Sequence, residues 1–223
     1  MLDSKRMDIG FQADCFDIDC KRCARLADFL ADVKAKNPTY FCKPVPPFGD
    51  ANARLLIVGL APGMHGANRT GRPFTGDYAG VLLYETLHKF GFATQPQSIT
   101  ADDPQRLINC RISNAVKCLP PENKPLPAEI TTCNAFLSAE LLELPANSVI
   151  FALGNIAHQA VIKGLGLKLK DYKFGHAAQH ALPNSMVLVD SYHCSRYNTQ
   201  TKRLTEAMFH DVFAEIVLLI KRT

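Results

Sequence analysis

The feature that most constrains the fold is a short apolar segment that runs directly into a long loop rich in glycine and proline. Residues 54–60 read Arg-Leu-Leu-Ile-Val-Gly-Leu, and the loop occupies residues 61–77. A continuous apolar run of this length is typical of a strand in a sheet that is covered on both faces. Further strands are predicted over residues 111–116, 148–153 and 186–190.

Helices are predicted between these strands. Their ranges are 22–36, 81–90, 128–144, 156–163 and 201–221. Strands that alternate with helices indicate a parallel sheet with helices on both of its faces. Since the chain shows no internal repeat and no boundary between domains, the sequence predicts an α/β fold. It is a single-domain, three-layer α/β/α arrangement with a central, mainly parallel four-stranded sheet.

Composition excludes several classes of protein. The 223 residues are 47% hydrophobic and 21% charged, which is ordinary for a globular chain and unlike a disordered or collagen-like one. No apolar run is long enough to span a bilayer, and the first ten residues do not resemble a signal peptide. We therefore expect a cytoplasmic protein with no membrane partner. The net charge of +4 does not by itself indicate a nucleic-acid partner.

Polar and glycine-containing segments follow all four predicted strands. The first strand leads into the loop of 61–77, the second ends at Asn114, the third at Gly154 and Asn155, and the fourth at Ser191-Tyr-His-Cys-Ser195. Ligands of open α/β sheets bind beyond the carboxyl ends of the strands. These segments therefore predict one cleft at that edge of the sheet.

The loop of 61–77 carries neither of the common nucleotide-binding motifs. It lacks both G-x-G-x-x-G and the phosphate-binding G-x-x-x-x-G-K-[ST]. Five glycines between Gly59 and Gly76 let the backbone approach a ligand closely, while Asn68, Arg69 and Arg72 add polar and cationic groups. The alternative is a glycine-rich surface loop with solvated arginines.

Eight cysteines are the second informative feature. A reducing compartment makes disulfides improbable, which leaves metal ligation or simple burial. Cys20, Cys23, Cys118 and Cys133 follow the spacing C-x2-C-x94-C-x14-C, and four thiolates can hold either zinc or an iron–sulfur cluster. The alternative is four small buried apolar side chains. Cys15 and Cys42 could compete as ligands, whereas Cys110 and Cys194 are expected to be unligated.

Two histidines are candidates for binding a ligand. His193 lies at the end of the fourth predicted strand, where a hydrogen-bond donor could meet a ligand oxygen, and His65 lies in the glycine-rich loop. A single histidine at a strand end is more often structural than catalytic, so both interpretations stay open.

Four segments of the chain, in order, resemble the motifs of the type 5 uracil-DNA glycosylases, an iron–sulfur branch of the uracil-DNA glycosylase superfamily. Gly59 to Asp77 resembles the first motif, which in this branch lacks a polar residue at the usual water-activating position. Cys20-Lys-Arg-Cys23 resembles the N-terminal ligand pair, and Ser113 to Pro125 the strand and cluster-ligand block. Ser191 to Thr201 resembles the second catalytic motif with its DNA-inserting loop.

The resemblance covers the chain from about Cys20 to Phe209 and implies a DNA repair glycosylase. Its substrate would be uracil flipped out of double-stranded DNA, with hypoxanthine and other deaminated or modified bases as further candidates. Residues 1–223 would form a single glycosylase-like domain, expected to be a monomer, with the N-terminal cysteine-bearing helix packed on it. Cys20, Cys23, Cys118 and Cys133 would ligate a [4Fe–4S] cluster.

The resemblance also implies roles for residues of the cleft. Phe74 can stack on the base, Asn114 can pair with its edge, and His193 can donate to uracil O2 as negative charge develops there. The first motif contains one carboxylate, Asp77, which could orient water or stabilise the sugar cation. Its alternative role is an N-cap for the following helix.

The remaining implied contacts concern the backbone of the loop and the DNA around the flipped base. Gly59, Ala61, Gly63 and His65 would complete the base-binding site. Arg69 and Arg72 could contact phosphates, and Arg196, Tyr197 and Asn198 could enter the gap left by the extruded base. The sequence departs from the family pattern at Cys194, where the related His-Pro-Ser motif has proline.

Two other functional classes remain as alternatives. A non-catalytic protein of the same fold could bind damaged DNA, although the presence of Asp77, Asn114 and His193 argues against this. A zinc-structured nucleotide-binding domain is weakened by the missing phosphate motifs.

Overall fold

A computed structural model describes residues 16–222, and its centre is one six-stranded sheet. The strand order is β1-β3-β2-β4-β6-β5. The strands are β1 (Phe48–Gly49), β2 (Leu55–Gly59), β3 (Cys110–Asn114), β4 (Val149–Leu153), β5 (Gln179–Ala181) and β6 (Val187–Ser191).

The four predicted strands are the four inner ones, and neighbouring inner strands are parallel. The prediction of four strands is corrected by β1 and β5, which add one antiparallel strand at each edge. These edge strands have two and three residues, and they do not form apolar runs like those of β2 and β4. Segments this short carry too little periodicity to be recognised from sequence.

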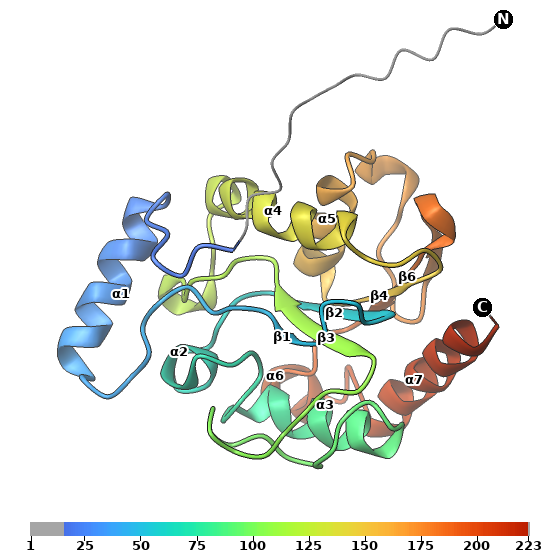
Figure 1. Cartoon of the computed structure of the whole chain (residues 1–223), viewed down its shortest axis with the longest axis horizontal. Helices are drawn as coiled ribbons and strands as arrows, with labels where there is room; N and C mark the ends of the chain where they lie inside the picture. Colours follow the sequence, from blue (N-terminus) through green and yellow to red (C-terminus); the bar gives the residue numbers. More distant parts are fainter. Residues whose placement is uncertain (1–15, 223) are drawn as a thin grey trace, which may run out of the picture.

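Seven α-helices lie around the sheet of residues 16–222 (Figure 1). They are α1 (Ala24–Lys36), α2 (Ala67–Thr70), α3 (Tyr78–Lys89), α4 (Pro127–Leu142), α5 (Asn155–Gly164), α6 (Arg196–Gln200) and α7 (Glu206–Lys221). Three short 3₁₀ helices are η1 (Pro121–Asn123), η2 (Leu169–Asp171) and η3 (Pro183–Ser185). The predicted helix over 201–221 is shorter than expected, because Thr205 caps α7 by accepting a hydrogen bond from the Met208 amide.

The helices form layers on both faces of the sheet. In Figure 1, α4 and α5 lie above the sheet and α3 and α7 lie below it. Strand β4 is buried throughout and divides its side chains between the two cores. Phe151 packs with α3 and α7, whereas Ile150 and Ala152 pack with α4 and α5. This alternation explains why the strand reads as uniformly apolar.

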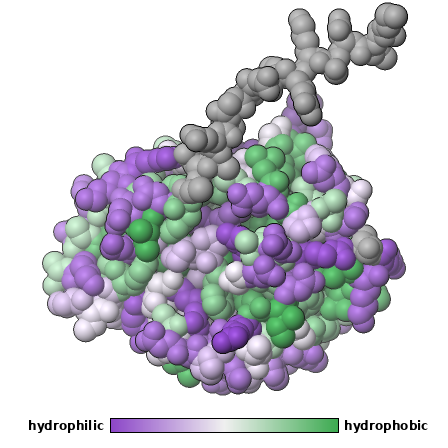
Figure 2. All heavy atoms as spheres, viewed as in Figure 1, coloured by the Kyte–Doolittle hydropathy of each residue, from purple (hydrophilic) through white to green (hydrophobic). Residues whose placement is uncertain are grey.

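The N-terminal helix α1 packs beside the segment that follows β3. Leu26 belongs to an apolar cluster with Val116 and Phe136, and Leu30 belongs to one with Leu119. The viewed surface in Figure 2 mixes hydrophilic and hydrophobic residues. Within residues 16–222, no helix combines the length and apolarity that crossing a membrane requires.

The sheet register brings the ends of the inner strands together. Gly59 of β2 lies beside Asn114 of β3, and Leu153 of β4 lies beside Ser191 of β6. Because these strands are parallel, the segments that leave them emerge at one edge of the sheet. That edge carries the candidate site.

Candidate active site

A cavity of about 380 Å³ lies at the carboxyl ends of β2, β3 and β6. Its walls come from the loop after β2, the start of α3, the end of β3, η1 and the segment after β6. The lining residues are Leu60, Ala61, Gly63, Ala67, Phe74, Asp77, Ala79, Asn114, Asn123, His193 and Ser195.

The cavity brings together most of the residues that the sequence assigned to the cleft. Six of the predicted substrate-binding and catalytic positions line it: Ala61, Gly63, Phe74, Asp77, Asn114 and His193. Two others do not. His65 is exposed, and its ring pairs with the hydroxyl of Tyr40 at 2.8 Å. Gly59 lies behind Asn114 and Phe74, which line the cavity.

Gly59 contributes to the shape of the site because it has no side chain. A Cβ atom at this position would lie 2.5 Å from Asn114 Oδ1 and 2.7 Å from the Phe74 ring. Real Cβ contacts are not this short, so any other residue would displace both pocket side chains. Gly59 therefore lets the amide and the ring approach the end of β2.

Phe74 forms an apolar wall of the cavity in an unusual backbone conformation. Its φ is +53°, a region that bulky residues rarely adopt, and its side chain is buried. The carbonyl of Phe74 lies 1.8 Å from where a Cβ of Gly80 would be, so the first turn of α3 also requires glycine. The ring lies against that of His193, with centroids 6.0 Å apart and an interplanar angle of 27°.

Asp77 both caps a helix and lines the cavity. Its Oδ1 accepts a hydrogen bond from the Gly80 amide at 2.8 Å, which makes Asp77 the N-cap of α3. Its Oδ2 faces the glycines of the loop, because a Cβ at Gly66 would lie 2.4 Å from this oxygen. Burial raises the pKa of the Asp77 carboxyl, while the backbone N–H groups of Gly80 and Ala79 oppose that rise.

His193 is held in the cavity wall by the residues that follow it. The side-chain amide of Asn198 donates to the His193 carbonyl at 2.9 Å. Burial lowers the pKa of His193 to about 4, so its imidazole is neutral at neutral pH and carries one donor and one acceptor nitrogen.

Cys194, which departs from the family pattern, also anchors this segment. Its side chain is fully buried, and its thiol lies 3.4 Å from the Ala79 carbonyl in the first turn of α3. The contact joins the segment after β6 to the helix that Asp77 caps.

Asn114 supplies a buried amide at the end of β3, where it is 3% exposed. Sequence reasoning missed a second amide, Asn123, in η1. The signal for Asn123 was weak: it follows two prolines and a glutamate, and its φ of +56° is tolerated by asparagine better than by most residues. Ser195, which lies in the predicted cleft segment but was given no role of its own, lines the cavity and caps α6 by accepting from the backbone amide of Asn198.

The predicted DNA-contacting residues divide into exposed and engaged side chains. Tyr197 is 71% exposed, and Arg196 is exposed with its guanidinium 4.9 Å from the centroid of the Tyr78 ring. Arg69 is exposed, and its guanidinium lies above Gly76. Asn198, by contrast, is half-buried and bonded to the His193 carbonyl, so its amide serves the protein itself.

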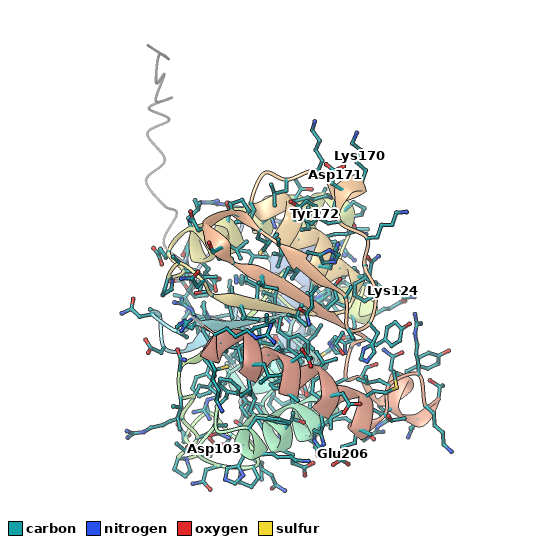
Figure 3. The ribbon with its side chains drawn as sticks, turned by 90° about the vertical axis from the view of Figure 1, so that its right-hand side faces the viewer. Asp103, Lys124, Lys170, Asp171, Tyr172 and Glu206 are labelled. Carbon is teal, nitrogen blue, oxygen red and sulfur yellow. The ribbon has the colours of Figure 1, made fainter. Side chains whose placement is uncertain are left out.

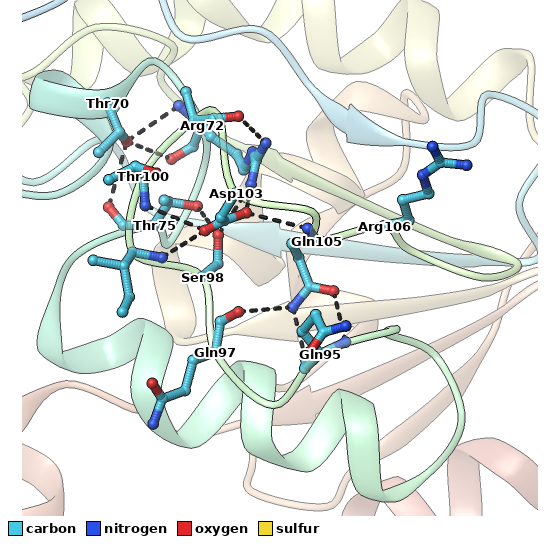
Figure 4. Close-up of polar contacts among 12 residues, drawn as sticks. Thr70, Arg72, Thr75, Gln95, Gln97, Ser98, Thr100, Asp103, Gln105 and Arg106 are labelled. Carbon is cyan, nitrogen blue, oxygen red and sulfur yellow. Dashed lines mark hydrogen bonds and ion pairs between the residues drawn. The ribbon is translucent and has the colours of Figure 1, made fainter.

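Arg72 points into the protein (Figure 4). It forms an ion pair with Asp103, donates to the Ala101 carbonyl and bonds the Ser98 hydroxyl, and its side chain is 12% exposed. The guanidinium also lies 4.5 Å from the centroid of the Phe48 ring. In this arrangement Arg72 is not presented to a phosphate. It ties the glycine-rich loop to residues 98–103.

Four of the cysteines line a second, small cavity, away from the first. Cys20 and Cys23 come from the segment before α1, Cys118 from the segment after β3, and Cys133 from α4. Burial, together with the neighbouring thiols of Cys133 and Cys20, raises the pKa of Cys118 to about 12. The backbone amide of Lys117 bonds the Cys133 sulfur at 3.2 Å.

The sulfur atoms of this cavity do not form the compact group that the ligands of one metal ion form. Among the described residues, no three of these sulfur atoms lie within 4.8 Å of one another, the separation that ligands of one metal ion would satisfy. The competing cysteines do not line this cavity: Cys42 accepts from the Asn68 amide and belongs to the apolar cluster against which Cys118 packs, while Cys110 and Cys194 are buried in the core below the sheet. Cys15 falls outside the described residues.

Comparison with known proteins decides the family. A model of the uracil DNA glycosylase superfamily matches residues 46–217, a range that contains all eleven residues of the larger cavity. The chain is 45% identical over 201 residues to the type-5 uracil-DNA glycosylase of Thermus thermophilus, with 88% of this chain and 91% of that protein covered. The chain belongs to the type-5 uracil-DNA glycosylases.

Other relatives agree with this assignment. The type-5 uracil-DNA glycosylase of Pyrobaculum aerophilum is 40% identical over 192 residues, with 84% of this chain and 83% of that protein covered. A type-4 uracil-DNA glycosylase of Thermotoga maritima is 37% identical over 117 residues, which cover 52% of this chain and 53% of that protein. The type-5 likeness thus extends over most of the chain, whereas the type-4 likeness covers about half.

The packing behind the cavity of this type-5 glycosylase predicts how one glycine substitution behaves. Gly59→Ala should lower the melting temperature and disturb the pocket, because its new methyl group would overlap Asn114 and Phe74. Gly63→Ala is the matched control, since its Cβ would meet its nearest neighbour, Asp77 Oδ2, at 3.7 Å. Thermal denaturation of both variants checks the prediction. Equal melting temperatures for the two would contradict the packing described here.

Proposed function

We propose that this protein hydrolyses the N-glycosidic bond of uracil in double-stranded DNA, and so begins base excision repair. The observation that carries the proposal is the single cavity that combines an aromatic wall, Phe74, with the amide of Asn114, the carboxyl of Asp77 and the imidazole of His193. Family membership supports the same reaction.

The size of the cavity suits one extruded base. At about 380 Å³ it lies near the lower end of ligand pockets, which span roughly 300–1,000 Å³. An enzyme that acts on a base in duplex DNA must flip it out of the stack and bind it between apolar surfaces. Phe74 supplies such a surface, and Asn114 supplies an amide that can both accept from the uracil N3–H and donate to O4.

Bond cleavage leaves negative charge on the departing uracil. His193 is neutral at neutral pH, so one ring nitrogen can donate a hydrogen bond to uracil O2 as that charge develops. This hydrogen bond strengthens as negative charge builds on O2, so it stabilises the transition state more than the bound substrate. As the N1–C1′ bond breaks, its electron pair stays on uracil. The oxygen of water bonds to C1′, and the proton that this water loses neutralises the uracil anion.

Cleavage also leaves positive charge on the sugar, and Asp77 can stabilise that charge or orient the attacking water. Its Oδ1 is fixed by the Gly80 amide, and the carboxyl borders the cavity. Backbone N–H groups that stabilise the carboxylate oppose the effect of burial. The N-cap interaction and the chemical role are therefore compatible, because the hydrogen bond from the Gly80 amide also fixes the Asp77 carboxylate at the edge of the cavity.

The exposed side chains beside the cavity can engage the DNA duplex. Arg69 and Arg196 can contact phosphates, which would make binding depend on salt concentration. Tyr197 is 71% exposed and can fill the gap left by the flipped base. We infer that the protein acts as a cytoplasmic monomer, with hypoxanthine and other deaminated bases as further candidate substrates.

We propose a [4Fe–4S] cluster, ligated at the four-cysteine cavity, as the cofactor. Cys20, Cys23, Cys118 and Cys133 converge there from three segments of the chain, and four thiolates form a complete ligand set for such a cluster. When bound, the cluster would hold α1 and α4 to the segment that follows β3.

Asp77→Asn tests the reaction while preserving the helix cap, because asparagine is as good an N-cap as aspartate. The variant should keep its melting temperature and its binding of uracil-containing duplex, but its single-turnover excision rate should fall at least tenfold. Excision of uracil from a labelled duplex, at saturating enzyme, measures the rate.

Thr205→Ala is the matched control for Asp77→Asn, because it removes the N-cap of α7, a helix that does not line the cavity. It should cost about 1 kcal/mol of stability and leave the excision rate unchanged. Native excision by Asp77→Asn would assign the carboxyl to the cap alone. A wild-type protein that binds uracil-containing duplex without cleaving it would instead be a damage-binding protein.

His193→Ala should slow uracil excision by about 10²–10³, the usual effect of losing one donor to a developing negative charge. The loss should shrink for duplexes with 5-substituted uracils that leave more readily. His65→Ala is the comparison, since His65 does not line the cavity, and its rate should stay near that of the native protein. Equal losses across all substrates, together with a lower melting temperature, would give His193 a purely structural role.

Cys118→Ser should lose iron, visible absorption and thermal stability, because it removes one proposed ligand. Cys42→Ser is the matched control: Cys42 is buried outside the four-cysteine cavity, and a serine there can still accept from the Asn68 amide. Iron analysis and the absorption spectrum of both proteins check the ligand set. Equal iron contents would refute it.

A further inference from the structure

A cluster of ligand-type side chains lies outside both cavities. His158 of α5, His180 of β5 and Asp190 of β6 place one nitrogen or oxygen each within 4.8 Å of one another. His158 Nδ1 lies 2.9 Å from Asp190 Oδ1, and His180 Nε2 lies 3.2 Å from Asp190 Oδ2. The side chains of Asp190 and His158 are 0% and 1% exposed. The function proposed above uses none of these three.

The hydrogen bonds of His158 show that the cluster needs an added positive charge. Its Nε2 lies 3.1 Å from the carbonyl oxygen of Tyr172, which can only accept, so this nitrogen carries hydrogen. In a neutral imidazole, Nδ1 is then an acceptor, and it faces the carboxylate oxygen of Asp190. Two acceptors repel at this distance. Either a proton or a metal ion must lie between the Nδ1 atom and the carboxylate.

The surroundings have the features of a metal site. A histidine that ligates a metal usually donates its other N–H to a backbone carbonyl, as His158 does to Tyr172. The rings of Tyr172 and Phe174 pack against the two histidines and give the cluster an apolar shell. Figure 3 shows Tyr172 beside Lys170 and Asp171 at the periphery of the molecule. The His180 side chain, 15% exposed, offers a route for an ion from solvent.

We propose that His158 Nδ1, His180 Nε2 and the Asp190 carboxylate bind a divalent transition-metal ion of the zinc class. Two imidazoles and one carboxylate are ligands that zinc and its neighbours accept. The ion would join α5 and the edge strand β5 to β6. Its ligand in β6, Asp190, lies three residues before His193. This site contains no thiol and is separate from the four-cysteine cavity.

The test compares zinc binding by the native protein with that of His180→Asn, the variant at the most exposed ligand. His88→Asn is the control, because His88 is an exposed histidine on α3. Each protein is dialysed against chelator and then against Zn²⁺, and its zinc and iron contents are measured. We expect one more zinc per chain in the native and His88→Asn proteins than in His180→Asn, with equal iron in all three.

Two further measurements make the result independent of glycosylase activity and of the thiols. Co²⁺ bound at this site should give visible d–d bands without the sulfur-to-cobalt charge-transfer band that cysteine ligands produce. Saturating Zn²⁺ should raise the melting temperature of the native protein by about 5–10 °C and leave that of His180→Asn unchanged.

The outcomes that would overturn the site are definite. Equal zinc contents in native protein and His180→Asn would place the zinc elsewhere, as would a cobalt spectrum with a thiolate band. Absence of zinc from both proteins would leave a proton as the added charge. Each of these results rejects the metal site whether or not the protein excises uracil.

Discussion

The site depends on how closely the loop after β2 can approach the strand ends, and glycine sets that distance. A Cβ atom at Gly59, Gly66 or Gly80 would fall between 1.8 and 2.5 Å from an atom of Asn114, Asp77 or Phe74. Because these three positions are glycine, the loop can turn back on the sheet and place the Phe74 ring and the Asp77 carboxyl beside β3. The positive φ of Phe74 belongs to the same compression. The pocket therefore exists because backbone occupies space that side chains would otherwise fill.

Burial then sets the charges inside this compact site, in opposite directions for its two titratable groups. It raises the pKa of the Asp77 carboxyl and lowers that of the His193 imidazole. Backbone amides at the start of α3 oppose the rise in the Asp77 pKa. The lowered pKa of His193 keeps its imidazole neutral. The buried Cys194, whose thiol contacts the Ala79 carbonyl, links the two segments that carry these groups. One carboxyl and one uncharged donor can thus face the same small volume.

Much of this arrangement could be predicted from the sequence, because it depends on long patterns. Strands β2 and β4 are continuous apolar runs, and the parallel order of the inner strands places Asn114 and His193 at one edge. The edge strands lacked such patterns. Partners distant in the chain were also invisible: Arg72 is recognisable as a cation, but only the fold reveals Asp103 beside it. Asn123 escaped for a third reason, since a single amide in a proline-flanked turn has no periodicity to identify it.

The segment after β3 has a consequence for how the pocket is held in shape. Asn114 lines the larger cavity, Cys118 lines the four-cysteine cavity, and Asn123 returns to the larger one. One wall of the pocket is therefore a single segment that begins and ends at a pocket amide, Asn114 and Asn123, and passes through the four-cysteine cavity between them. A cluster bound at Cys118 would restrict the backbone between Asn114 and Asn123 and so reduce its conformational entropy. The proposed cluster would thus constrain one wall of the pocket from the four-cysteine cavity, which shares no lining residue with the pocket.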